Sequence, residues 1–175
     1  MLREMLDWLQ VAAQQGVVLD QLGSPAMAML AAFGLGLFFG AVPFGGSELL
    51  ALAAGAVTPR AMVIPLVLLL TLGHVLGKML WYWLGTLGSR VTNTKAQAWI
   101  AKAHEFNAKH PKLEVGVLLM SALASVPPFH VMAVASGVVR VPLGVFLASV
   151  LTGRLVRFGL LAGVPGAVGW LRAVN

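Results

Sequence analysis

The chain has 175 residues, 59% of them hydrophobic and only 10% charged, with a formal net charge of +6. A soluble domain of this length would not stay in solution with so apolar a composition, which predicts an integral membrane protein. The cations stand between apolar segments and form no basic stripe with interleaved aromatic residues. We therefore expect membrane phosphates as their partners, and no nucleic acid. The absence of cysteine excludes disulfides and thiolate metal sites.

The N-terminal segment, residues 1–22, is expected to form an amphipathic helix on the membrane surface. Leu2, Leu6 and Leu9 recur at helical intervals, with charged and amide side chains largely on the other side. Its three acidic residues do not fit a cleavable signal, so we expect this segment to be retained.

The first apolar region, residues 25–87, is interrupted by helix-breaking residues. Pro43, Gly45 and Gly46 divide its first half into two pieces, each short for a hydrocarbon layer of about 30 Å. This pattern predicts a re-entrant helical hairpin that returns to its starting side. Its break should face protein or a watery cavity, because lipid cannot satisfy irregular backbone. Residues 61–87 then form a spanning helix that ends in interfacial aromatic residues.

A polar and basic segment at residues 88–114 follows. Trp99, Ile100 and Phe106 stand among lysines, which is typical of a helix lying on an anionic membrane surface. The order of segments puts it on the cation-rich side of the membrane, so residues 90–112 are expected in the cytoplasm.

The second apolar region, residues 115–163, repeats the order of the first. Pro127 and Pro128 break its first half, and the last spanning helix is expected from Pro142 to Gly163, helped by the tolerance of proline at a helix start. The C-terminal tail, residues 164–175, is too short to cross the membrane.

The two regions also align in sequence. Residues 50–59 match residues 132–141 through Ala-x-Ala-[Ala or Ser]-Gly-x-Val, and Gly73 falls over Gly153. A hairpin plus one crossing starts the next unit on the opposite side, so the repeats should be antiparallel, as in many transporters. The predicted fold is an all-α integral membrane protein of one domain. Its two antiparallel repeats each combine a re-entrant hairpin with a transmembrane helix, and amphipathic helices lie on the surface.

Ionisable side chains within the apolar segments are the candidates for function, because burying charge in a membrane is costly. Glu48 follows the first break, at the start of a half-helix. A helix N-terminus stabilises its charge, and a site wet enough to ionise it would also let it carry a proton. The alternative is that Glu48 only caps its helix.

Four basic side chains are candidates for binding an anion or another substrate. His74 and Lys78 share one helix face, and Arg154 shares another with Arg157. Each also has a structural alternative. Lys78 and Arg157 can reach the lipid headgroups. Arg154 can form an ion pair with Glu48, and His74 can be a hydrogen-bonded core histidine.

No enzyme is predicted from these residues. The chain has no HExxH, GxSxG or Walker sequence, and a single embedded carboxylate cannot supply the paired acids of a hydrolase. His74 and His130 have no acid or cysteine near them in sequence, so we expect neither a metal site nor a cofactor.

Three stretches, PFGGSELLALAAG, GHVLGKMLWYWLG and VPPFHVMAVASGVVRVPLGVFLASVLTGR, resemble the DedA family, also called the SNARE-associated or VTT-domain superfamily. The resemblance covers most of residues 38–160. It implies two re-entrant hairpins that face one another, and a role in membrane homeostasis as a proton-coupled flippase or scramblase of lipids, including polyprenyl phosphates in bacteria. The matching landmarks are Pro43, Glu48, Gly55, Gly77, Tyr82, Gly85, Gly137, Phe146 and Gly153.

The chain departs from the family pattern at two positions. Lys78 stands where the family commonly has an acid, and Phe129 stands where it has an arginine in the second break. Arg154 or Arg157 is a candidate to replace that arginine. The chain resembles a short, divergent branch of the family.

Residues and resemblance together predict a multi-pass transporter of the bacterial inner (plasma) membrane. Its substrate would be an anionic, phosphate-bearing lipid, and protons would be a second partner. Whether the chain forms a homo-oligomer is left open. The alternative is a non-transporting membrane scaffold whose charges form structural ion pairs. A solvent-accessible pocket that reaches Glu48 would favour transport.

Overall fold

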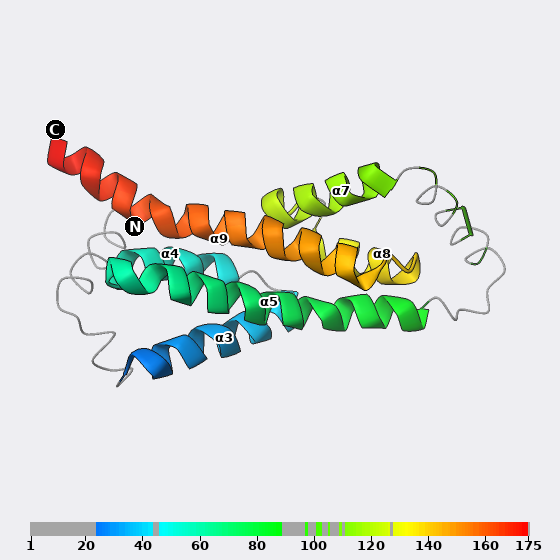
Figure 1. Ribbon diagram of the computed structural model, residues 1–175, viewed down its shortest axis with the longest axis horizontal. Coiled ribbons are helices and arrows are strands. Elements are labelled where there is room, and N and C mark those ends of the chain that lie inside the picture. Colours follow the sequence, from blue (N-terminus) through cyan, green and yellow to red (C-terminus); the bar gives the residue numbers. More distant parts are fainter. Residues whose placement is uncertain are drawn as a thin grey trace. The chain divides into compact units, whose positions relative to one another are not determined.

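The computed structural model describes residues 24–43, 46–88, 97, 101–102, 105, 109, 111–126 and 128–174, and the regular structure among these residues is helical (Figure 1). The predicted N-terminal amphipathic helix and the breaking residues Gly45 and Pro127 lie outside the described residues. The helices are α3 (Pro25–Ala41), α4 (Ser47–Val57), α5 (Arg60–Gly88), α7 (Pro111–Ala124), α8 (Phe129–Val138) and α9 (Leu143–Val174).

The first half of the first apolar region forms a pair of short helices, α3 and α4. The interruption between them lies where proline and glycine predict it. The Ser24 hydroxyl oxygen accepts a hydrogen bond from the Met27 amide at 3.3 Å, and Pro25 takes the first helical position, where a missing N–H does no harm. The helix ends at Ala41, shortly before Pro43. The chain becomes helical again at Ser47, and the two helices pack against each other.

The second apolar region forms an equivalent pair, α7 and α8, which also pack against each other. Helix α7 ends at Ala124 and α8 begins at Phe129, on either side of the predicted break. Helix α7 begins at Pro111 and so takes in the end of the predicted basic surface segment. Within that segment, residues 97, 101–102, 105 and 109 are helical and exposed, and Lys109 forms an ion pair with Glu105 at 2.7 Å.

The two long helices are long and apolar enough to cross a membrane, over Arg60–Leu87 and Leu143–Gly166. They begin within one residue of the predicted starts. The helix α9 itself continues through Pro165 to Val174, beyond the expected end of the span at Gly163 and into the predicted C-terminal tail. A proline inside a helix removes one backbone hydrogen bond, which a membrane helix can tolerate.

The chain folds as two compact units, and each long helix contributes to both. Unit 1 holds α3, α4, the part of α5 up to His74 and the part of α9 from Phe158 onwards. Unit 2, Val75–Arg157, holds the rest of α5, α7, α8 and the first part of α9. The compact units are therefore not the stretches predicted as repeats, because each unit takes one long-helix segment from the other half of the sequence.

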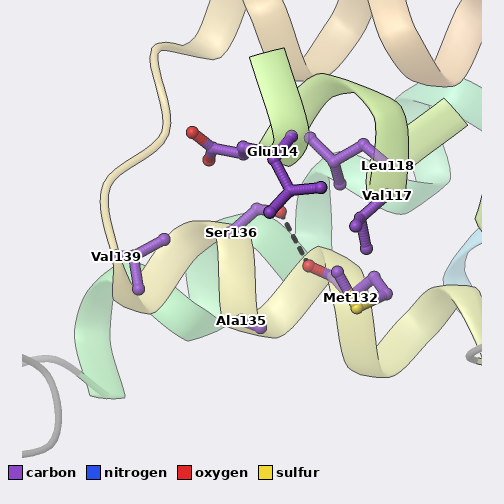
Figure 2. Close-up of a pocket in the computed structure, with 8 residues that line it drawn as sticks. Glu114, Val117, Leu118, Met132, Ala135, Ser136 and Val139 are labelled. Carbon is purple, nitrogen blue, oxygen red and sulfur yellow. Dashed lines mark hydrogen bonds between the residues drawn. The ribbon is translucent and has the colours of Figure 1, made fainter. Parts of the chain in front are cut away.

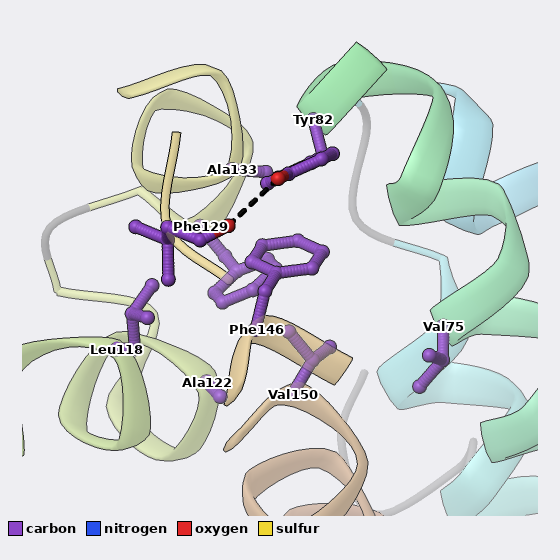
Figure 3. Packing of buried hydrophobic residues seen from close by; sticks show 9 residues of the cluster. Val75, Tyr82, Leu118, Ala122, Phe129, Ala133, Phe146 and Val150 are labelled. Carbon is purple, nitrogen blue, oxygen red and sulfur yellow. Dashed lines mark hydrogen bonds between the residues drawn. The ribbon is translucent and has the colours of Figure 1, made fainter. Parts of the chain in front are cut away.

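Three aromatic rings pack together within the core of unit 2 (Figure 3). The Phe129 and Phe146 rings stack with centroids 6.3 Å apart, and Tyr82 lies 5.0 Å from Phe146. The Tyr82 hydroxyl donates a hydrogen bond of 2.7 Å to the Val141 carbonyl, which satisfies the phenol inside the core. Phe129 and Phe146 are both buried. This packing fixes the start of α8 against the first part of α9.

Candidate functional site

An arginine lies beside the start of α8, the helix that follows the interruption in unit 2. Arg154 projects from α9 and is only 4% exposed. Its guanidinium carbon lies 5.2 Å from the centroid of the Phe129 ring, within the range of a cation–π contact. Phe129 is the first residue of α8. The contact therefore places the guanidinium near the N-terminus of α8, which is the positive end of the helix dipole.

Arg157, one turn further along α9, lies at the other side of the same interruption. One of its terminal nitrogens donates a hydrogen bond to the Leu123 carbonyl, in the last turn of α7. The last carbonyls of a helix lack helical partners and carry partial negative charge, which a cation stabilises. The side chain thus links α9 to the end of α7 within unit 2.

Lys78 lies in the part of α5 that belongs to unit 2 and is 4% exposed. The alternative that it reaches the headgroups is therefore wrong, since a lysine that does so exposes its ammonium group. Unit 2 consequently contains three of the four predicted basic site residues: Lys78, Arg154 and Arg157.

Unit 1 contains the other two candidates, Glu48 and His74. Glu48 lies in the first turn of α4, where the adjacent Ser47 hydroxyl donates a hydrogen bond of 3.1 Å to Oε2. His74 is 2% exposed and meets the Phe158 ring edge to face at 5.4 Å, which agrees with a core histidine. The ion pair between Glu48 and Arg154 joins residues of different units and stays a prediction.

The other histidine of interest, His130, is the second residue of α8. It is partly buried, with its ring centroid 6.1 Å from that of Trp81. The described residues include no group of three His, Cys, Asp or Glu side chains placed to hold a metal ion.

Two features of unit 2 do not follow from the predictions made on the sequence. Phe129 was noted only as a departure from the family pattern, yet its ring supports Arg154. Glu114 was placed in the basic surface segment, yet it lies in the first turn of α7 and lines a pocket against α8 (Figure 2). Its position at the edge of an apolar run was the available signal.

These observations define an all-helical membrane protein with two interrupted helix pairs and buried basic side chains at one interruption. The chain belongs to the VTT domain family, which matches residues 24–165. This is the domain of the DedA or SNARE-associated family, so the predicted resemblance is confirmed. Its members are generally membrane proteins of a transporter type. Comparison with curated proteins and with solved structures found no match.

Proposed function

We propose that this VTT-domain protein moves an anionic, phosphate-bearing lipid, such as a polyprenyl phosphate, across the bacterial inner membrane as part of membrane homeostasis. The observation that carries the proposal is the burial of Arg154 beside the Phe129 ring. A charged side chain at the centre of a membrane helix costs about 2.5–3.5 kcal/mol or more, so such residues usually serve a transport path. The planar guanidinium donors also match phosphate oxygens better than an ammonium does.

The N-terminus of α8 supports the same assignment. Its N-cap is Pro128, which makes no side-chain capping hydrogen bond. Interrupted helices in transporters direct their N-termini towards anionic groups of the substrate, because the first-turn N–H groups and the helix dipole both favour negative charge. The Arg154 guanidinium adds a full positive charge at the same place. We infer that the headgroup phosphate binds there, with Arg157 and Lys78 adding to the positive potential of unit 2.

Glu48 is the proposed proton carrier. It lies at the start of α4 and accepts a hydrogen bond from Ser47. A carboxylate at a helix N-terminus is stabilised in its charged form, and neutralising it by protonation changes the charge of that end of unit 1. The predicted repeat is supported by equivalent packing in the two units. Gly55 of α4 and Gly137 of α8 each lie against a backbone carbonyl of a long helix. The basic segment, residues 90–112, is proposed to lie in the cytoplasm.

The test uses the full chain in vesicles with a fluorescent polyprenyl phosphate, whose passage between leaflets is followed by quenching from outside. Arg154→Gln should lower the rate at least about tenfold, since a charge-assisted contact contributes about 1.5–3 kcal/mol. The translocation rate of Arg154→Lys should lie between those of the wild type and Arg154→Gln, because lysine keeps the charge and loses the planar donors. The matched control is Arg140→Gln, which removes an exposed arginine of the same unit.

Each outcome decides between transport and the scaffold alternative. Transport predicts that the wild-type vesicles move the lipid, that the lipid is recovered chemically unchanged, and that Arg140→Gln behaves like the wild type. An Arg154→Gln protein that melts like the wild type and still moves the lipid at the full rate would overturn the site. Wild-type vesicles that move no lipid would favour a scaffold.

A further inference from the structure

A second candidate site, with mostly apolar walls, lies in unit 2 between α7 and α8. It is a pocket of about 230 Å³, and Arg154 is not among its lining residues. Figure 2 displays Glu114 and Val139 towards one end and Val117 and Met132 towards the other. The remaining walls are Leu113, Leu118, Ala135 and Ser136.

The polar groups of this pocket accept hydrogen bonds and offer no spare donor. The Ser136 hydroxyl already donates to the Met132 carbonyl at 2.8 Å. The Oε1 atom of Glu114 is shielded from solvent and has no hydrogen-bond partner among the described residues. Burial raises the pKa of the Glu114 carboxyl accordingly. An unmatched buried acceptor is costly, and a positively charged N–H donor would offset that cost.

We propose that this pocket binds a single-chain alkylammonium amphiphile, with its ammonium group on Glu114 and its chain along the apolar walls. The pocket is smaller than the roughly 300–1,000 Å³ that drug-sized ligands occupy, which favours one slender chain. A single carboxylate is too few ligands for a calcium ion, which takes about six to eight oxygens. An anionic amphiphile would meet the Glu114 charge without a donor to compensate. This site is independent of the proposed phosphate site.

The experiment uses the full chain in phosphatidylcholine vesicles and a photoreactive dodecylamine, with cross-links mapped to α7 and α8 by peptide mass spectrometry. Unlabelled dodecylamine, dodecanol and dodecyl phosphate compete for the site at about pH 8, where a primary alkylamine is still protonated. We expect dodecylamine to displace the label at about tenfold lower concentration than dodecanol. Dodecyl phosphate should be the weakest of the three competitors.

Three variants separate the parts of the site. Glu114→Gln should keep displacement by dodecanol, as expected of an intact pocket, and lose the preference for the amine. Ala135→Leu should fill the pocket and abolish labelling of both helices. The matched control, Glu105→Gln, removes an exposed carboxylate that pairs with Lys109 and should leave the preference unchanged.

The results that would overturn the proposal are equal displacement by amine and alcohol in the wild type, an amine preference that survives in Glu114→Gln, or stronger displacement by dodecyl phosphate. Loss of all labelling in Glu114→Gln also counts against the proposal. The substitution would then have removed the pocket itself and not only the preference for an ammonium group. Arg154→Gln is expected to label like the wild type, so failure of the transport site and failure of this pocket are distinguishable.

Discussion

The two half-helices that follow an interruption, α4 in unit 1 and α8 in unit 2, begin with opposite chemistry. The second residue of α4 is Glu48, with the hydroxyl of Ser47 on its carboxylate. The second residue of α8 is His130, and the guanidinium of Arg154 lies over the residue before it. Helix α4 thus brings its own negative charge to its positive end. At α8 the chain adds positive charge, which is the sign that attracts an anionic ligand.

The packing around these half-helices is nevertheless alike. The ninth residue of each is a glycine, Gly55 in α4 and Gly137 in α8. A Cβ atom added to either would overlap a backbone carbonyl, that of Ala162 in unit 1 and that of Tyr82 in unit 2. The two units therefore share a backbone arrangement and differ in charge, so mutations can test the packing and the charge separately.

The largest effect is expected from breaking the shared frame. Gly137→Ala places a methyl group on the Tyr82 carbonyl, and backbone cannot move aside as a flexible side chain can. We expect a loss of about 3 kcal/mol or more of stability, measured as a fall in the unfolding temperature of the detergent-solubilised protein. Gly55→Ala should behave alike in unit 1.

Each of these variants has a matched control in the same unit. Gly116 in α7 and Gly34 in α3 are helical glycines with nothing within 4 Å of an added Cβ. Alanine at these positions should stabilise the protein by about 0.5–1 kcal/mol, since glycine is the poorer helix former. If all four substitutions gave the same change, close packing would not be the reason for the glycines.

The next effect concerns the charge difference itself. His130→Glu gives α8 the carboxylate that α4 has at the same position. A carboxylate at this N-terminus would compete with the phosphate for the helix dipole and for Arg154, so lipid translocation should fall about tenfold. His130→Gln, which adds no charge, is the control and should retain most of the rate. Equal rates for the two variants would show that the start of α8 does not receive the anion.

The reciprocal change at α4 tests proton coupling. Glu48→Gln removes the titrating group and keeps a side chain of the same shape. Translocation should then proceed at the same rate with and without an imposed proton gradient, whereas the wild type should respond to the gradient. Ser47→Ala serves as the control, because it removes the hydroxyl on the Glu48 carboxylate and keeps the acid. A gradient response that persists in Glu48→Gln would assign the proton to another group.

The interruptions were predictable from the sequence because proline and glycine act locally. Pro43 with Gly46, and Pro128 at the second break, end or start helices through their own backbone restrictions. The spanning helices followed from the length of the apolar runs. The continuation of α9 through Pro165 did not, since proline usually marks a helix end and only the surroundings decide whether the helix continues.

The candidate site was predictable in its residues but not in their surroundings. Arg154 and Glu48 stand out because charge is rare in apolar segments. The ring beneath Arg154 comes from Phe129, which is 25 positions earlier in the chain, and helical periodicity carries no information about such a contact. The sequence left two positions open for Lys78 for the same reason, because helical periodicity does not say whether tertiary packing encloses the side chain, as it does here.

The smallest effect is expected where the two half-helices end. Helix α4 passes into extended backbone at Thr58, whereas α8 ends with Arg140 in the left-handed region at φ 55°. The Val141 amide bonds the Ser136 carbonyl at 2.9 Å, and the Arg140 amide bonds that of Gly137, which is the Schellman arrangement that favours glycine. Arg140→Gly should therefore raise stability by about 0.5–1 kcal/mol, seen as a small rise in unfolding temperature. Arg140→Ala removes the same charge without relieving the backbone and should give no such rise, so an equal gain in both variants would attribute the effect to charge.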